Sequence, residues 1–206
     1  MSLISKLSEQ FGRFPGIGPR QSRRFVQFLL MQNQSYLDDL SDSIAKLKGE
    51  VSLCSSCFRF FVTNGSHEHE LCNVCSDTNR DHGILMVVEK DIDCENIERS
   101  RAYNGLYFIL GGTVPILEKR ANGIREKELK STVTERGEKK ELKEVIIAFS
   151  LNPDGEHTGD HVVKLLSPLK EKYGFTTTLF GRGLSTGSEL EYSDSETIKN
   201  AFTTRR

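Results

Sequence analysis

Four cysteines form two Cys-x-x-Cys pairs, Cys54-Ser-Ser-Cys57 and Cys72-Asn-Val-Cys75, with fourteen residues between the pairs. Each pair can present two thiolates from one tight turn, and four thiolates complete a tetrahedral zinc site. The loop between the pairs is slightly shorter than the usual spacing of about 15–20 residues. Four protein ligands leave no open position for water, so we expect one structural Zn²⁺ per chain rather than a catalytic one.

Other chemistry is conceivable for these cysteines and their neighbours. Disulfide pairing is the main alternative, but the sequence shows no secretory context to favour it. His67 and His69 could compete as ligands, although four cysteines already fill the site and solvated loop histidines are the simpler interpretation. Cys94 stands alone in the acidic stretch 91–95, where neighbouring carboxylates would raise its pKa, so we do not expect a nucleophile there.

Acidic residues follow two apolar segments that are typical of buried parallel strands. Glu89 follows residues 84–88, and Asp154 and Glu156 follow residues 145–149. In α/β folds, sites lie at the carboxyl ends of strands. The three carboxylates could bind Mg²⁺ through oxygen ligands. Solvated loop residues or helix caps are an equally good interpretation of the spacing alone.

A third candidate site lies in the segment Phe14-Pro-Gly-Ile-Gly-Pro19. Two glycines around one apolar residue allow a hairpin too tight for Cβ atoms, and Pro19 suits the first turn of a following helix. Free backbone N–H groups at that helix start can hold a phosphate. The pattern is typical of a helix-hairpin-helix DNA-binding element, with a plain turn as the alternative. The residues expected to contact DNA are Gly16, Gly18, Arg20, Arg23 and Arg24.

The elements that position these residues follow from apolar spacing. Helical periodicity recurs three times within the first 50 residues. Further along, four strand candidates alternate with helical segments and favour an α/β domain; they are residues 84–88, 106–110, 145–149 and 175–180. We expect a loop from Leu151 to Gly159 before a helix that contains Val162. The charged stretch 118–143 predicts a solvated surface region with one or two amphipathic turns, or a linker.

Composition restricts the remaining classes. The 206 residues are 36% apolar and 28% charged, with a net charge of −1, so DNA contact must come from local patches. No apolar run is long enough to span a membrane, and the N-terminus lacks the features of a signal peptide. We therefore expect a cytoplasmic protein with no membrane partner.

In their order along the chain, these pieces resemble the RecR family of bacterial recombination mediators. The resemblance rests on the glycine hairpin, the four cysteines, residues 75–81, Val87-Val-Glu89 and Asp154-Gly-Glu156 as Toprim motifs, residues 105–112, and the Walker B-like tail from Arg182 to Asp194. It implies a multi-module α+β and α/β fold. The modules would be a helix-hairpin-helix region (1–52), a four-cysteine zinc finger (53–78), a Toprim domain (79–180) and a C-terminal Walker B-like oligomerisation segment (181–206).

The resemblance also implies a function. A non-catalytic clamp, as a homodimer or a homotetrameric ring, would bind single-stranded, double-stranded or gapped DNA without sequence preference. It would act with RecO, and with RecF where present, to load RecA at single-stranded gaps, and would associate with the nucleoid during repair. The acidic cluster Glu89, Asp154 and Glu156 would bind a partner's basic surface or a weak Mg²⁺.

Three departures from the family pattern affect this expectation: Ser185 replaces a proline, His157 replaces a small residue, and Asn152-Pro153 directly precedes Asp154. Two other functions remain open at this point. One is a Mg²⁺-dependent Toprim nuclease or primase-like enzyme that uses the three carboxylates. The other is a zinc-stabilised interaction module without DNA contact.

Overall fold

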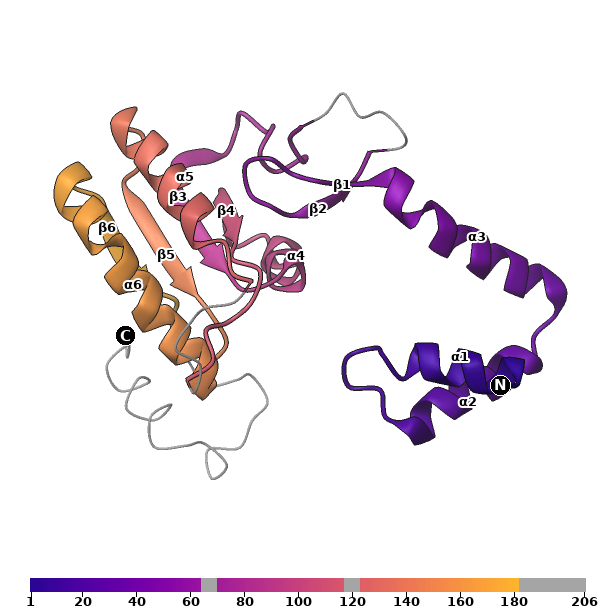
Figure 1. The fold of residues 1–206 in the computed structure, drawn as a ribbon. Coiled ribbons are helices and arrows are strands. Elements are labelled where there is room, and N and C mark those ends of the chain that lie inside the picture. Colours follow the sequence, from indigo (N-terminus) through magenta and orange to yellow (C-terminus); the bar gives the residue numbers. More distant parts are fainter. Residues whose placement is uncertain (64–69, 117–122, 182–206) are drawn as a thin grey trace. The chain divides into compact units, whose positions relative to one another are not determined.

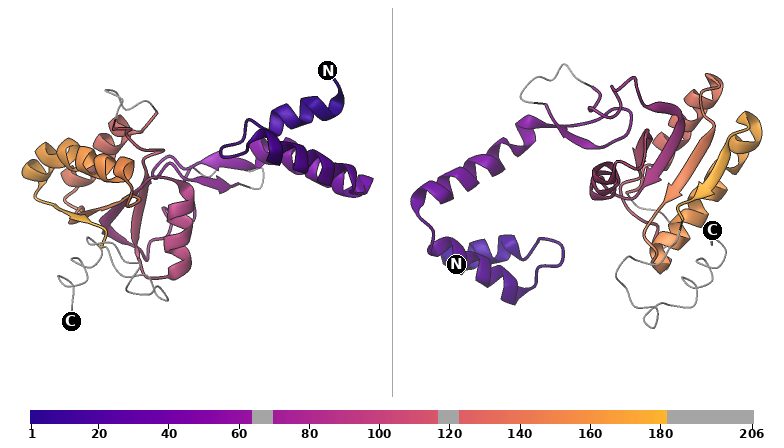
Figure 2. Two further views of the ribbon diagram at one scale, coloured as in Figure 1. Left: turned by 90° about the horizontal axis from the view of Figure 1, so that it is seen from below. Right: turned by 180° about the vertical axis from the view of Figure 1, so that it is seen from behind.

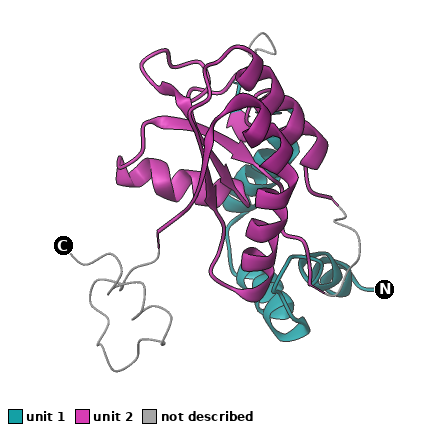
Figure 3. Ribbon diagram, turned by 90° about the vertical axis from the view of Figure 1, so that its left-hand side faces the viewer, with its two compact units in different colours: residues 1–52, 62–65 teal, residues 53–61, 66–206 magenta. Residues whose placement is uncertain are grey.

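The computed structural model describes residues 1–63, 70–116 and 123–181. The described residues fall into two compact units, one from 1–52 and 62–63 and the other from 53–61, 70–116 and 123–181 (Figure 3). The predicted tail motif from Arg182 to Asp194, together with His67 and His69, lies outside the described residues.

The first unit contains the three predicted helices, α1 (Leu3–Phe11), α2 (Pro19–Leu30) and α3 (Gln34–Glu50). Side-chain caps start two of them, since Ser2 accepts a hydrogen bond from the Ser5 amide and Asn33 accepts one from the Tyr36 amide. Helices α1 and α2 pack through an edge-on contact between Phe11 and Phe25, whose ring centroids lie 5.7 Å apart. This packing holds the glycine hairpin between two fixed helices.

Two short strands, β1 (Val51–Leu53) and β2 (Phe60–Val62), form a small separate sheet (Figure 1). The first cysteine pair lies in the turn that joins them. The backbone amide of Phe60 donates a hydrogen bond of 2.7 Å to the carboxylate of Asp91, at the start of helix α4 (Asp91–Ser100). The cysteine-bearing turn is therefore attached to the α/β part of the chain.

The second unit is built on a parallel four-stranded sheet in the order β4-β3-β5-β6 (Figure 1). Its strands are β3 (Asp81–Val88), β4 (Gly105–Ile109), β5 (Glu144–Ala148) and β6 (Thr176–Leu179). Helix α4 covers one face, and helices α5 (Glu126–Glu138) and α6 (Pro153–Tyr173) cover the other (Figure 2). Crossover connections between parallel strands are right-handed. The chain moves in one direction across the sheet from β3 to β4 and in the opposite direction to reach β5 and β6, so α4 lies on one face and α5 and α6 lie on the other. The four predicted strands and the α/β class are confirmed.

The core of this unit lies between the sheet and its helices. Strands β3 and β4 are buried almost throughout, as expected for central or covered parallel strands. Helix α5 contributes Leu129 and Val133, and helix α6 contributes Val162 and Leu166, all four side chains being fully buried. Strand ends β3 and β5 lie side by side, because Val88 pairs with Ala148. The acidic residues that follow these strands are thus brought to one edge of the sheet.

Two local predictions were wrong. Residues 126–138 form a helix of 13 residues rather than one or two surface turns, because Leu129, Val133 and Gly137 share a buried face. Helix α6 begins at Pro153, so residues 153–159 are helical and not a loop. The cause is a complete start signal, in which Asn152 caps the helix, proline occupies its first position, and two acids lie in its first turn.

Within the described ranges, none of the helices combines the length and the apolar character that a membrane crossing requires.

Candidate functional site

The four cysteine sulfurs predicted as metal ligands gather into one cluster. All lie within 4.8 Å of one another, and the Sγ atoms of Cys57 and Cys72 are 3.6 Å apart. A tetrahedral ion with metal–sulfur bonds of about 2.3 Å would place its sulfurs about 3.8 Å apart, so the cluster has the right size. All five cysteines of the chain are free, which leaves the disulfide alternative without support. The donor set fits a bound metal ion.

Backbone hydrogen bonds shape the two turns around the cluster. The Phe58 amide donates to the Cys54 carbonyl at 3.0 Å, and the Ser76 amide donates to the Cys72 carbonyl at 3.0 Å. The Cys72 amide also donates to the Cys54 sulfur at 3.4 Å. Hydrogen bonds from the Cys57, Cys72 and Cys75 side chains lower the pKa of Cys54. Hydrogen bonds within the same cluster raise the pKa of Cys57 and Cys75, so without an ion the four groups share protons, whereas a metal ion would require all four as thiolates.

Phe58 attaches the first cysteine turn to the sheet. It adopts a left-handed backbone with φ of 61°, unusual for a residue with a side chain. Its ring packs edge-on against Phe108 of β4 at 5.3 Å, and the Arg125 guanidinium lies over the same ring at 5.4 Å. Arg125 also donates to the Ile109 carbonyl at 2.9 Å, while the Ile109 amide donates to the Cys57 carbonyl at 2.9 Å. The cysteine turn thereby completes the outer edge of β4.

Cys94 is fully buried on α4, and burial raises its pKa to about 12. This direction agrees with the prediction that Cys94 is not a nucleophile. The main cause is burial, whereas the sequence had indicated the neighbouring carboxylates. The nearby Arg59 acts in the opposite direction.

The acidic residues lie at the carboxyl ends of the strands, as predicted, but in separate environments. Glu89 follows β3, is 8% exposed, and its carboxylate lies 2.6 Å from the Lys90 ammonium. Asp154 is exposed in the first turn of α6 and accepts a hydrogen bond of 3.4 Å from the Ile116 amide. Glu156 lies two residues further along this turn.

The three carboxylates do not form a ligand cluster. Among residues 1–63, 70–116 and 123–181, the four cysteines are the one set of three or more ligand groups close enough to share a metal ion. Asp154 and Glu156 instead lie where the α6 dipole favours negative charge. The cap interpretation of these two acids therefore accounts for their positions better than a Mg²⁺ site does.

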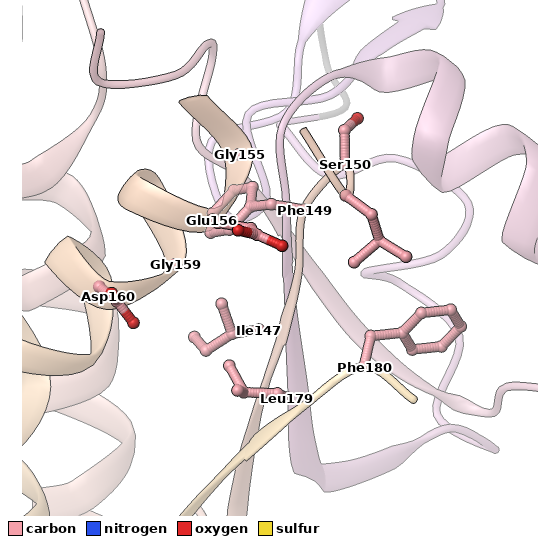
Figure 4. Close-up of a pocket in the computed structure, with 10 residues that line it drawn as sticks. Ile147, Phe149, Ser150, Gly155, Glu156, Gly159, Asp160, Leu179 and Phe180 are labelled. Atoms are coloured by element: carbon pink, nitrogen blue, oxygen red, sulfur yellow. The ribbon is translucent and has the colours of Figure 1, made fainter. Parts of the chain in front are cut away.

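A small cavity of about 210 Å³ opens beside Glu156, bounded by the end of β5, the start of α6 and the end of β6 (Figure 4). Figure 4 shows Glu156 and Asp160 on one wall, and Leu179 and Phe180 at the end of β6. Gly155 permits this packing, since a Cβ there would lie 2.0 Å from the Ser150 carbonyl oxygen. The cavity thus combines two carboxylates with an apolar wall.

His157, one of the departures from the family pattern, contacts the segment that directly follows β4. Its Nδ1 atom lies 3.1 Å from the Val114 carbonyl oxygen. The neighbouring Thr158 hydroxyl accepts a hydrogen bond of 2.8 Å from the Val114 amide and donates one of 2.6 Å to the Asp154 carbonyl. These contacts hold the loop after β4 against the start of α6.

In the first unit, the glycine hairpin presents the start of α2. Gly18 is the N-terminal cap of α2 and Pro19 its first residue, as predicted. Of the two glycines, only Gly16 has a positive φ, 76°, and no atom lies within 4 Å of a Cβ added at either one. The expectation of a turn too tight for Cβ atoms is therefore wrong, because the requirement for glycine comes from the backbone angle at Gly16.

The arginines of α2 are available to an anion. Arg20, Arg23 and Arg24 are exposed, and within the described residues none of the three forms an ion pair. Arg13, by contrast, pairs with Glu9 at 2.8 Å. An open groove of about 470 Å³ runs beside the hairpin and is lined in part by Ile17, Pro19 and Arg23. Three unpaired cations beside free helix-start amides can hold a phosphate backbone.

Sequence reasoning missed several residues that join the elements of the second unit. The Arg80 guanidinium forms an ion pair with Glu98, and Glu98 also accepts a hydrogen bond of 2.7 Å from the Tyr107 hydroxyl. Arg125 and Phe58 were also not predicted. No spacing pattern signals any of these residues, because their partners come from separate elements.

The fold and the clusters together define a Toprim-domain protein with a four-cysteine metal centre. Comparison with known families agrees: residues 83–178 match the Toprim domain, and residues 183–206 match the family described as RecR, C-terminal. Recombination protein RecR of Mycobacterium leprae (strain TN) is 33% identical over 204 residues, 98% of this chain and 96% of that protein. Recombination protein RecR of Bifidobacterium longum subsp. infantis is 35% identical over 204 residues, 98% of this chain and 95% of that protein.

The chain belongs to the RecR family. The resemblance inferred from the motifs is confirmed. Family membership supports a role in recombination and does not favour the nuclease or primase-like alternative.

Proposed function

We propose that this protein is a DNA-binding recombination mediator that acts without catalysis. It acts with RecO, and with RecF where present, to load RecA at single-stranded gaps. The observation that carries the proposal is the unpaired arginine set at the start of α2, in a chain of the RecR family. Phosphate contacts of this kind position a protein on DNA without reading the bases.

The DNA contact is assigned to Gly16, Gly18, Arg20, Arg23 and Arg24. The free amides that follow Gly18 approach a phosphate, and the arginines supply the surrounding charge. Binding should be independent of sequence and should weaken steeply with salt, because neutralised phosphates release their counterions. Single-stranded, double-stranded and gapped DNA all present such phosphates.

The metal is proposed to be one structural Zn²⁺ per chain, held by Cys54, Cys57, Cys72 and Cys75. When bound, the ion joins two turns that are too short to form a core of their own. The separation of the sulfurs and the burial of three of the four cysteines support this assignment. Elemental analysis of the purified protein tests it: about one zinc per chain is expected, and a metal-free folded protein would contradict it.

The carboxylates Glu89, Asp154 and Glu156 are proposed to serve a partner's basic surface rather than a catalytic metal. Their separate environments support this role, since catalysis by paired metal ions needs carboxylates that converge on one place.

We further propose a homodimer or homotetrameric ring, a cytoplasmic location with nucleoid association during repair, and modules at residues 1–52, 53–78, 79–180 and 181–206.

A binding experiment tests the DNA assignment. The double variant Arg20→Ala/Arg24→Ala should lose about tenfold or more in affinity for gapped duplex DNA at moderate salt, and its salt dependence should be shallower by about two counterions. The matched control is Lys46→Ala/Lys48→Ala, which removes the same charge from exposed positions on α3. Equal affinities for the wild type and the arginine variant would instead favour an interaction module without DNA contact.

A further inference from the structure

A polar cavity of about 340 Å³ lies directly beside the four-cysteine centre. The cysteine turns contribute Ser55, Ser56 and Cys75 to its wall, and α5 with the residue after it contributes Thr132, Arg136 and Lys139. The cavity lies within the second unit. It connects the metal centre to a helix that is distant from the cysteines in the sequence.

Cys75 is the ligand that reaches this cavity. The other three cysteines are at most 1% exposed, whereas Cys75 is only partly buried. A chelator, a thiol reagent or water therefore meets the centre first at the Cys75 sulfur. The rate at which the ion is lost should depend on how well that thiolate is held.

Arg136 contributes a cation to the wall of this cavity. Its Nη1 atom is buried and has no hydrogen-bond partner within the part of the chain that the structure describes. A buried guanidinium N–H without a partner is costly unless a negative charge lies nearby. Cys75, Glu135 and Glu141 line the same cavity, and within the described residues Arg136 forms an ion pair with neither carboxylate.

The position of Arg136 is fixed by the packing of α5. Its neighbour Gly137 lies against the Tyr173 ring of α6, where an added Cβ would approach a ring carbon to 2.5 Å. Val133, one turn earlier, is fully buried. The packing of Val133 and Gly137 therefore fixes the position of α5 at Arg136.

We propose that Arg136 is a positioning residue for the metal centre, where its guanidinium offsets the negative charge at Cys75 and slows loss of the ion through this cavity. The inference rests on the zinc ion proposed above. Four thiolates around a dication leave a formal charge of roughly −2, which a neighbouring cation stabilises. Groups that contact metal ligands from outside typically change metal affinity by about 10–100-fold.

Lys139 provides a matched control in the same cavity. It is an exposed cation, and its ammonium already lies 2.7 Å from the Glu135 carboxylate. Removing Lys139 changes the net charge of the cavity by the same amount as removing Arg136, but takes nothing from the buried side. A difference between the two variants therefore reports position rather than overall charge.

The experiment measures the rate at which the zinc-loaded full chain transfers zinc to an excess of a chromogenic chelator. Arg136→Met should release zinc about tenfold faster than the wild type. Arg136→Lys keeps the charge and should stay within about threefold of the wild type, and Lys139→Met within about twofold. Circular dichroism of each variant establishes that it is folded.

Two results would overturn the inference: a folded Arg136→Met variant with the wild-type rate, or a Lys139→Met variant as fast as Arg136→Met. If Arg136→Met does not fold, partial alkylation of the wild type with iodoacetamide tests the proposed access through Cys75. The first label should fall on Cys75. A first label on Cys54, Cys57 or Cys72 would refute the inference. A wild type without zinc would refute the metal centre itself, which separates the two failures.

Discussion

Phe58 offers a sharp test of how the cysteine turn is attached to the sheet. Truncation of a fully buried phenylalanine to alanine costs about 3–5 kcal/mol. Phe58 is half-buried, and its ring contacts Phe108 and the Arg125 guanidinium. We therefore expect Phe58→Ala to cost about 2 kcal/mol in the stability of the α/β unit.

Phe58→Gly should be less harmful than Phe58→Ala, which reverses the usual order. The backbone φ of 61° at this position disfavours any residue with a Cβ. Relief of the left-handed conformation is worth about 1–2 kcal/mol, and the added flexibility of glycine in the unfolded chain costs about 0.5–1 kcal/mol. The glycine variant should thus be about 0.5–1 kcal/mol more stable than the alanine variant.

Hydrogen exchange followed by mass spectrometry is the suitable assay, because it reports the opening of β3, β4 and β5 separately from the helical unit. Phe60→Ala is the control, since Phe60 is 56% exposed two residues away and should change little. The reasoning would be refuted by a glycine variant that exchanges faster than the alanine variant. It would equally be refuted by a Phe58→Ala variant that behaves like Phe60→Ala.

Three further predictions concern stability. Gly155→Ala should cost about 3 kcal/mol in stability, because its Cβ would lie 2.0 Å from the Ser150 carbonyl oxygen. The control Gly49→Ala has open space on α3 and should be neutral or stabilising by up to about 1 kcal/mol. Thermal unfolding of both variants measures the difference. Burial alone would raise the pKa of Glu98, but hydrogen bonds from Arg80 and Tyr107 outweigh it and hold the pKa below its usual value. A carboxyl with a lowered folded-state pKa stabilises the protein above the unfolded pKa of about 4.3 and loses that contribution as pH falls through the folded value. The stability advantage of the wild type over Glu98→Gln should therefore shrink on acidification below about pH 4. An advantage that stays constant in acid unfolding curves would contradict this expectation. Metal removal by a strong chelator should speed hydrogen exchange of the Ile109 amide, because this amide donates to the Cys57 carbonyl. The exchange of amides in α1 should stay unchanged. Equal protection of the Ile109 amide with and without metal would argue against the coupling of the metal centre to β4.

Much of the fold could be predicted from the sequence, because its signals are local. Continuous apolar runs identified β3 and β5, and the glycine hairpin with Pro19 identified the start of α2. Helix α5 was missed because its buried positions, Leu129 and Val133, are separated by polar residues and completed by a glycine. Glycine carries no hydrophobic signal, although here it permits contact with Tyr173.

The sites were predicted unevenly for the same reason. The four cysteines lie in two short motifs, so their spacing alone indicated the cluster that the structure contains. The three carboxylates were placed correctly at strand ends, but their distances depend on side-chain directions and on the start of α6. Arg125 contacts Phe58 of the first cysteine turn, and Arg136 lines a cavity together with Cys75; both relations exist only after folding.

The central claim is that this protein binds DNA as a mediator and does not cut it. One gel experiment with gapped duplex DNA, run with and without Mg²⁺ and read for both mobility and strand length, tests this claim most directly. We predict a shift that weakens steeply with salt, with all strands intact. Shortening of a strand that needs Mg²⁺ and disappears in a Glu89→Ala variant would contradict the account and indicate a Toprim nuclease.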